Sequence, residues 1–149
     1  MLLKNVCLEG VAYELPAYVM TTDAIFDELA PMLERLKIPQ EAIANASGVE
    51  ERRFWPVGMS IVESSTRAAR KVIEKTGIDP LDIGCIVSTS VCKDYIEPSM
   101  ASIVHGELGL SPSCLNFDIG NACLAFMNGV SVVGDMIACL LYTSPSPRD

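Results

Sequence analysis

The sequence FDIGNACLAF, residues 117–126, decides the fold of this chain. It begins in a short apolar run over residues 114–119, which predicts a strand. It ends in an apolar run over residues 122–138, which predicts a helix. Gly120 and Asn121 stand between the two runs and predict a tight turn. A strand that turns directly into a long apolar helix is a unit of an α/β fold.

The residues before this stretch continue the alternation of strand and helix. Residues 83–90 form a continuous apolar and β-branched run, typical of a strand that is buried on both faces. Residues 60–76 predict an amphipathic helix, and Gly77 ends it. Pro98, at a first-turn position, predicts another helix that ends near Gly109. The sequence therefore predicts the α/β class.

The first part of the chain predicts one more strand and a pair of helical segments. Residues 5–13 are apolar and rich in strand-forming types, so we expect the first strand there. Thr21 and Thr22 are candidate N-caps of a helix, and Pro31 inside that helix is expected to kink or split it. A short helical turn follows and ends at Gly48.

Residues 139–149 do not continue these patterns. They read CLLYTSPSPRD and interrupt the last helix without a capping signal. The string resembles the translated read-through of a sequencing adapter, so we expect residues 1–138 to be the native part. A natural flexible end rich in Pro and Ser is the alternative.

The composition is that of a folded and acidic chain. Of the 149 residues, 50% are hydrophobic and 20% are charged, which excludes intrinsic disorder. The formal net charge of −8 argues against a nucleic-acid partner. The six cysteines contain no CxxC pair, and their spacing fits neither a metal site nor a disulfide framework. We therefore expect a cytoplasmic protein in a reducing compartment, with no metal.

One segment, residues 122–142, has nearly the length of a membrane span. It contains Asn128, Ser131 and Asp135. An Asp near the centre of a bilayer costs roughly 2.5–3.5 kcal/mol. We therefore expect a buried helix and no membrane span.

Cys123 is the best candidate for a catalytic residue. The pattern places it one turn into the helix that follows the strand, where unpaired backbone N–H groups and the helix dipole favour a thiolate. Gly129 and Gly134 predict that neighbouring elements approach this helix closely. The alternative for Cys123 is a small buried hydrophobic residue, as most intracellular cysteines are.

Glu97 is the second candidate. A carboxylate ahead of a helix-opening Pro is usually a favourable charge at the helix N-terminus, and the functional alternative is a general base. The only histidine, His105, lies in the helix that Pro98 opens. A surface or partly buried helix position explains His105 better than a pairing with Cys123 does.

The segments STSV (residues 88–91), YIEPS (residues 95–99) and FDIGNACLAF (residues 117–126) together resemble the thiolase superfamily. Their order is similar to the N-terminal half of a 3-oxoacyl-ACP synthase III-like condensing enzyme. The resemblance is strongest to the bacterial olefin-biosynthesis branch, which joins two acyl-CoA thioesters head to head. It covers residues 4–138 and implies a thiolase-like fold, here the N-terminal βαβαβ half of a duplicated, layered α/β/α/β/α architecture.

This resemblance implies an acyltransferase that forms a carbon–carbon bond by Claisen condensation of two acyl-CoA thioesters. Cys123 matches the nucleophile that takes the first acyl group as a thioester. Glu97 matches the acidic residue that reaches into the partner subunit's active site of a homodimer. Joining two ordinary acyl thioesters requires the removal of a Cα proton, and Glu97 could be the base that removes it.

The resemblance also implies substrate-binding residues: Arg52, Arg53, Asn121 and Phe126. The two arginines end the stretch GVEERR, residues 48–53, which matches the family's Gly-Ile/Val-x-x-Arg-Arg stretch near the CoA entrance. Ala42 and Ala46 stand near the places where the synthase branch has an adenine-binding Trp and Arg. That difference counts against a plain synthase III. No cofactor is implied besides acyl-CoA, which is the substrate.

Several alternatives stay open at this point. Within the class, a 3-oxoacyl-ACP synthase III of fatty-acid initiation would use acyl-CoA and malonyl-ACP. Outside it, the chain could be a non-catalytic acyl-binding or assembly module, or a redox-sensing thiol protein, for which no resolving cysteine is evident. The family's remaining catalytic His and Asn belong to its C-terminal half. We therefore expect residues 1–138 alone to be inactive, poorly soluble or partly unfolded.

Overall fold

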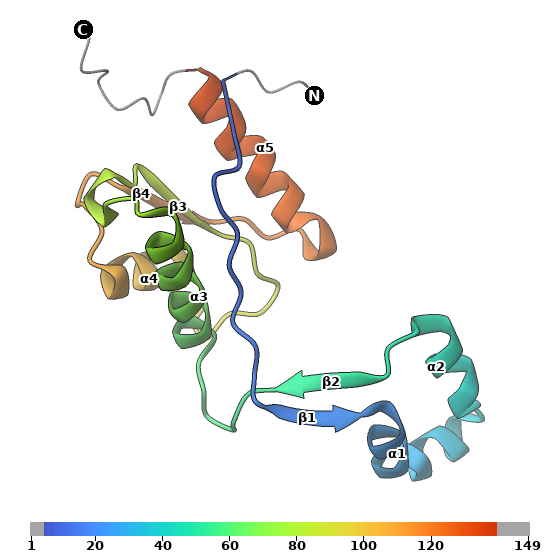
Figure 1. Cartoon of the computed structure of the whole chain (residues 1–149). Helices are drawn as coiled ribbons and strands as arrows, with labels where there is room; N and C mark the ends of the chain where they lie inside the picture. The colour runs from blue at the N-terminus through green and yellow to red at the C-terminus, as the bar shows by residue number, and fades with distance from the viewer. Residues whose placement is uncertain (1–4, 140–149) are drawn as a thin grey trace, which may run out of the picture. The chain divides into compact units, whose positions relative to one another are not determined.

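The computed structural model describes residues 5–139, which form two compact units (Figure 1). The smaller unit is residues 15–59, and the larger unit combines residues 5–14 with residues 60–139. All of the strand–turn–helix stretch, residues 117–126, belongs to the larger unit.

The smaller unit is a two-stranded antiparallel sheet with a pair of helices. Its elements in chain order are β1 (Tyr18–Thr21), α1 (Thr22–Leu36), α2 (Gln40–Ser47) and β2 (Glu51–Phe54). The strands pair from Tyr18 opposite Phe54 to Thr21 opposite Glu51. The Thr21 side chain accepts a hydrogen bond from the Ala24 N–H at 3.2 Å, so one of the two candidate N-caps is confirmed.

Helix α1 runs without a break through Pro31. Of the two outcomes expected at Pro31, a kink or a split, the split does not occur, because one helix spans Thr22–Leu36. Phe26 and Leu33 lie on either side of Pro31 and are both buried, so packing holds the two parts of the helix together despite the lost N–H group.

The larger unit contains a parallel β-α-β arrangement. Its elements in chain order are α3 (Ile61–Thr76), η1 (Pro80–Asp82), β3 (Cys85–Ser88), α4 (Met100–Leu108), β4 (Leu115–Asp118), η2 (Ala122–Leu124) and α5 (Ala125–Ala138). Strands β3 and β4 pair in parallel, from Cys85 opposite Leu115 to Ser88 opposite Asp118, and α4 is the crossover between them. The predicted α/β class is thereby confirmed.

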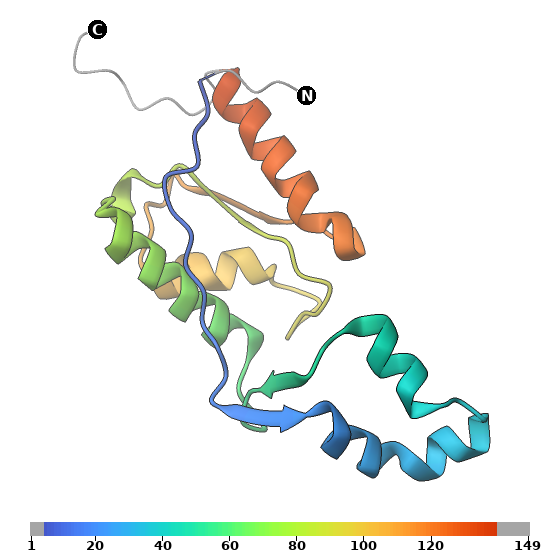
Figure 2. The same cartoon turned by 45° about the vertical axis from the view of Figure 1, so that its right-hand side comes forward.

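Helices cover both faces of this strand pair. Figures 1 and 2 show α3 and α4 on one face of β3 and β4, and α5 on the other. The buried core between the helices consists of Val62 from α3 with Met100 and Val104 from α4. Ile86 of β3 packs against this cluster, so the core joins the two helices to the sheet.

The predicted helices of this unit agree closely with the structure. Helix α3 begins after the N-cap Ser60 and ends at the left-handed Gly77. Helix α4 begins after the N-cap Ser99 and ends at the left-handed Gly109, so Pro98 precedes the cap and does not occupy the first turn as predicted. Each helix therefore has a polar start and a glycine end.

The strand predicted over residues 5–13 is wrong. That segment pairs with no strand among the described residues and runs along α3. A Cβ on Gly10 would lie 2.6 Å from Thr76 Cγ2, and Lys75 Nζ donates a hydrogen bond to the Val11 carbonyl at 3.2 Å. An alternating apolar pattern favours an extended backbone, but it does not by itself provide a partner strand.

Within residues 5–139, no helix has both the length and the apolar character to cross a membrane. The proposed adapter-derived tail lies outside the described residues, apart from Cys139.

Candidate active site

Cys123 lies in a short 3-10 turn, η2, between β4 and α5. The Leu124 N–H donates to the Asn121 carbonyl at 2.9 Å and closes this turn. The prediction that Cys123 lies one turn into the helix that follows the strand is therefore wrong in detail, because Cys123 precedes α5. Ala122 has a φ of +43°, a left-handed conformation, so the regular helix begins only at Ala125.

The conformation of Ala122 makes this connection unusual. An alanine in the left-handed region costs roughly 1–2 kcal/mol relative to ordinary helical backbone. Backbone strain of this kind concentrates at active sites, ligand clamps and switch regions. Cys123 is exposed, whereas Ala125, two residues later, is only 1% exposed. In the described part of the chain, Cys123 is thus not enclosed by the core, unlike Ala125.

The N-terminus of α5 differs from those of α1, α3 and α4. Those three helices each have a Thr or Ser N-cap whose side chain accepts a backbone N–H. Among the described residues, no side chain caps α5 or the preceding η2 turn. No side chain of the described residues therefore competes for this end of the helix, where the helix dipole favours a negatively charged sulfur or oxygen beside Cys123.

Cys85 in β3 and Cys114 just before β4 have a different environment from Cys123. Burial raises the pKa of the Cys85 thiol, and the neighbouring Cys114 raises it further. Burial also raises the pKa of Cys114, which is 4% exposed. A raised pKa disfavours the thiolate, so these residues are poor nucleophiles.

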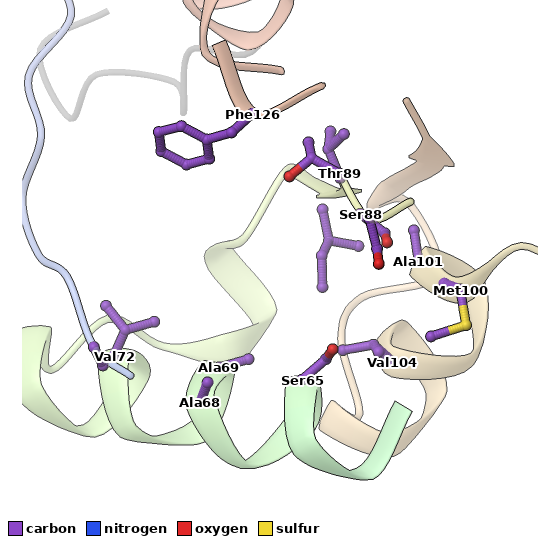
Figure 3. A pocket seen from close by; sticks show the side chains of 14 residues that line it. Ser65, Ala68, Ala69, Val72, Ser88, Thr89, Met100, Ala101, Val104 and Phe126 are labelled. Carbon is purple, nitrogen blue, oxygen red and sulfur yellow. The ribbon is translucent and has the colours of Figure 1, made fainter. Parts of the chain in front are cut away.

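Asn121 and Phe126 lie on the same connection as Cys123. The Asn121 side-chain amide donates to the Asn128 side-chain oxygen at 2.7 Å, which links the turn to α5. Phe126 is 66% exposed and lines a cavity of about 580 Å³ between α3, β3 and α4 (Figure 3). Small side chains such as Ala68 and Ala69 form the opposite wall, and Cys123 is not among the lining residues.

Helix α5 lies very close to β3. A Cβ on Gly129 would come within 2.7 Å of Thr89 Cγ2, just beyond the end of β3. The predicted close approach at this glycine is confirmed. Helix α5 and the turn before it also carry exposed apolar side chains, with Leu124, Met127 and Val130 all more than 40% accessible.

Glu97 lies in the loop between β3 and α4 and is exposed. Among the described residues, no hydrogen bond or ion pair joins Glu97 to Cys123, so no polar contact links the two candidates. The first N–H groups of α4 are occupied by other side chains: Ser99 accepts from Ser102, and Asp118 accepts from Met100. Glu97 is therefore not the group that caps this helix.

The loop that carries Glu97 is fixed by contacts of Asp94 and Lys93, which were not among the predicted site residues. Asp94 accepts the Ile61 N–H at 3.1 Å and the Val62 N–H at 2.9 Å, at the start of α3. Lys93 Nζ lies 2.8 Å from Asp118 Oδ2. The residue pair Lys93-Asp94 does not by itself predict these contacts, because the partners of both side chains lie far away in the sequence and only the fold shows them.

Asp118 accepts two backbone hydrogen bonds besides the Lys93 ion pair. They come from the Met100 N–H at 3.0 Å and the Ala101 N–H at 2.9 Å. Burial by itself would raise the pKa of Asp118, but the Lys93 ammonium and the two N–H groups outweigh it and lower the pKa. Asp118 therefore stays ionised at neutral pH.

Arg52 and Arg53 lie in β2 of the smaller unit. Arg52 donates to the Thr22 hydroxyl at 3.0 Å, and that hydroxyl donates to the Val49 carbonyl. Arg53 donates to the Pro16 carbonyl at 3.3 Å. Both guanidinium groups thus have contacts that stabilise the smaller unit.

His105 contacts the loop that follows its own helix. Its Nε2 lies 2.9 Å from the Ser111 carbonyl oxygen, and the residue is partly buried. The interpretation of His105 as a structural helix residue is confirmed. Residues 5–139 contain no group of three His, Cys, Asp or Glu side chains that could hold a metal ion.

In sequence, the chain is similar to proteins with two related names, acyl-CoA:acyl-CoA alkyltransferase and β-ketoacyl-[acyl-carrier-protein] synthase III. The chain is 39% identical to an acyl-CoA:acyl-CoA alkyltransferase of Xanthomonas campestris over 92% of its length. It is 35% identical to the enzyme of the same name from Shewanella oneidensis over 98% of its length. A β-ketoacyl-[acyl-carrier-protein] synthase III of Clostridium beijerinckii is 29% identical over 94% of the chain. No protein-family model matches the chain.

Solved structures give the same relationship. Xanthomonas campestris OleA with bound acetamide has a TM-score of 0.87 at 37% identity, over 95% of this chain and 44% of that one. The 3-oxoacyl-(acyl carrier protein) synthase III, FabH, of Xanthomonas oryzae has a TM-score of 0.87 at 38% identity, over 95% and 42% of the two chains.

The chain spans 40% of the Xanthomonas campestris relative and 44% of the Shewanella oneidensis relative. The matched part contains the β3–α4–β4 unit and the turn with Cys123. In sequence and in fold, the chain is similar to the N-terminal half of thiolase-fold condensing enzymes, which OleA and FabH represent.

Proposed function

We propose that the whole protein joins two acyl-CoA thioesters by Claisen condensation, with Cys123 as the nucleophile. The observation that carries this proposal is the exposed Cys123 on a left-handed turn at the uncapped start of α5. The relatives named acyl-CoA:acyl-CoA alkyltransferase support the choice of reaction. A variant of Xanthomonas campestris OleA has been solved with lauric acid and lauroyl-CoA bound, which supports the substrate class.

The first step is acyl transfer to Cys123. The thiolate attacks the thioester carbonyl of the first acyl-CoA, a tetrahedral oxyanion forms, and the CoA thiolate leaves and takes up a proton. The N–H groups near the start of α5 are suited to stabilise the negative charge in this step. The product is an acyl thioester on Cys123.

The second step forms the carbon–carbon bond. The Glu97 carboxylate removes a Cα proton from the second acyl-CoA, and the resulting carbanion attacks the acyl carbonyl on Cys123. The Cys123 thiolate leaves, and the product is a 3-oxoacyl-CoA that carries the second alkyl chain on its Cα. A decarboxylating synthase obtains the carbanion from malonyl thioester and needs no such base.

The whole protein is proposed to work as a homodimer in the cytoplasm, with Glu97 serving the partner subunit's Cys123. Support for the dimer comes from Glu97 itself, which is exposed and, among the described residues, makes no hydrogen bond with Cys123 of its own chain. Arg52, Arg53, Asn121 and Phe126 are proposed as substrate-binding residues. Phe126 supports this by its exposed ring at an apolar cavity.

The test supplies the whole protein with two long-chain acyl-CoAs, or with one acyl-CoA and malonyl-ACP. We expect condensed product from the acyl-CoA pair, and a loss of about 10²–10⁴-fold in Glu97→Gln with Cys123 acylation retained. Glu107→Gln, an exposed glutamate in α4, is the matched control and should keep full activity. Product only from malonyl-ACP would favour the synthase III alternative, which the relative from Clostridium beijerinckii represents.

No product from either pair, together with reversible acyl-CoA binding, would favour a non-catalytic acyl-binding module. We also propose that residues 1–138 alone are inactive, since the chain spans well under half of its relatives. Condensing activity in the purified 138-residue fragment would contradict that.

A further inference from the structure

We propose that Lys93 and Asp94 are positioning residues that hold the Glu97 loop against the starts of two helices. This inference rests on the proposed function, because it concerns the placement of the proposed base. It assigns a role to two side chains that need not touch substrate. The juxtaposition that carries it is a continuous chain of polar contacts from the start of α3, through the loop, to the start of α4.

The first contact of this chain fixes Asp94 on α3. Its two carboxylate oxygens accept the N–H groups of Ile61 and Val62, at 3.1 and 2.9 Å. Ser60 already accepts the N–H of Glu63 at 3.0 Å, so α3 has its own local N-cap. The contact with Asp94 is therefore an additional one, and it ties a segment more than 30 residues away to the helix.

The second contact fixes Lys93 on Asp118. The Nζ–Oδ2 distance is 2.8 Å, and the Asp118 side chain is only 8% exposed. Asp118 in turn accepts the first N–H groups of α4, from Met100 and Ala101. As at α3, the helix has a local serine cap, Ser99, in addition to this distant carboxylate. The low pKa of Asp118 keeps the ion pair formed at neutral pH.

These contacts restrain both ends of the segment that carries Glu97. Asp94 is bound before it, and Met100 is bound after it, which leaves Tyr95 and Ile96, both exposed, beside the glutamate. A short exposed segment with free ends would sample many backbone conformations, and fixing its ends removes most of them. A misplacement of about 1 Å can cost about 10²-fold in rate, so such restraint bears directly on proton removal.

Asp118 also relates the loop to the nucleophile. It is the last residue of β4, and the same strand leads through Asn121 to Cys123. Lys93 thus connects the loop of the proposed base to the strand that presents the proposed nucleophile. In a symmetric dimer, this connection would fix where each Glu97 stands relative to the interface and to the partner's site.

The test measures two rates on the same samples of whole protein. One is acylation of Cys123 by a long-chain acyl-CoA, read from the mass of the intact protein, and the other is formation of condensed product. Asp94→Asn and Lys93→Met are expected to lower condensation at least about tenfold and to keep acylation within about twofold. Lys93→Arg retains a cation for Asp118 and should restore most of the condensation rate.

Ser60→Ala is the matched control, because it removes the local cap of α3 and leaves the loop contacts intact. It should keep both rates within about twofold of the unaltered protein. The inference is overturned if Asp94→Asn and Lys93→Met condense at the normal rate, if both rates fall in parallel, or if Ser60→Ala has the same effect. If Glu97→Gln condenses at the normal rate as well, then Glu97 is not the base and the proposed function is wrong on that point. If Glu97→Gln is impaired and the Lys93 and Asp94 variants are not, then only the positioning role of Lys93 and Asp94 is wrong.

Discussion

Asp118 connects three parts of the larger unit: β4, α4 and the loop that carries Glu97. It ends β4, accepts two N–H groups of α4 and pairs with Lys93 of the Glu97 loop. A neutral residue at this position would leave the first N–H groups of α4 and the Lys93 ammonium without a carboxylate. The stability of the unit should therefore depend on the charge of this one side chain.

The charge of Asp118 predicts a dependence of stability on pH. Its pKa is lower in the folded protein than its ordinary value, so its contribution to stability is present at neutral pH. That contribution is lost as the pH falls below about 4 and through the folded pKa. In Asp118→Asn, the free energy of unfolding should be lower at pH 7, and it should fall less on acidification.

Urea unfolding of the whole protein and of Asp118→Asn at pH 7 and at about pH 3 measures this difference. Asp79→Asn is a suitable control, since Asp79 is an exposed carboxylate that accepts the Leu81 N–H at the start of η1. If acidification lowers the free energy of unfolding equally in the unaltered protein and in Asp118→Asn, then Asp118 is not the group responsible for this dependence on pH.

At the same scale, Ala122 shows where sequence reasoning was limited. The pair Gly120-Asn121 correctly indicated a turn, but the left-handed residue is Ala122, which follows the pair. Alanine carries no signal for that conformation, because its Cβ disfavours it. The surrounding fold imposes it, so a single sequence could predict Cys123 as a candidate but not the shape of its turn.

Among the elements, α5 depends on one small residue for its position. Gly129 faces Thr89, and a Cβ there would lie 2.7 Å from the Thr89 methyl group. Because threonine is β-branched and stiff, its side chain cannot simply move away. Gly129→Ala should therefore push α5 away from β3 and disturb the turn that carries Cys123.

We expect Gly129→Ala to lower the free energy of unfolding by roughly 1–3 kcal/mol, the usual cost of overpacking. Adding Thr89→Ser removes the opposing methyl group and should recover most of that loss. Gly106→Ala in α4 is the control, because a Cβ on Gly106 would meet no atom within 4 Å and alanine favours a helix by roughly 0.5–1 kcal/mol. Urea unfolding of the three variants measures the effects; equal stability of Gly129→Ala and the unaltered protein would contradict the close contact.

The helices of the larger unit could be predicted from local sequence patterns, whereas strand pairing and long-range contacts could not. The extents of α3 and α4 were predicted closely from the apolar face of α3 and from the glycine that ends each helix, whereas the serine caps are evident only from the structure. The segment over residues 5–13 was not predicted correctly, because a strand needs a partner that its own sequence does not specify. The contacts of Lys93 with Asp118 join residues far apart in the chain, and local patterns do not reveal such pairs.

For the molecule as a whole, two observations support a second half that packs on α5: the exposed apolar face of this helix and the greater length of the relatives. Met127 is 59% exposed and Val130 is 43% exposed, on a helix that carries no charged residue except Asp135. The chain spans 40% and 44% of its first two relatives. The proposed duplicated fold would cover such an apolar face with the second half of the protein.

This predicts opposite effects of the same substitutions in two contexts. Met127→Lys combined with Val130→Lys should reduce self-association of the 149-residue chain, as measured by size-exclusion chromatography. In the whole protein, the same pair should lower the melting temperature, because the lysines would be buried. A whole protein that tolerates both lysines without loss of stability would contradict the proposed packing of α5.

Acylation of Cys123 tests the central claim most directly. The whole protein is mixed with a long-chain acyl-CoA, and the mass of the intact protein and the released CoA are measured. The proposed function predicts a mass increase of one acyl group with release of one CoA, located at Cys123 by peptide mapping and absent in Cys123→Ala. Acyl transfer that persists in Cys123→Ala, or that occurs at Cys85 or Cys114, would contradict it.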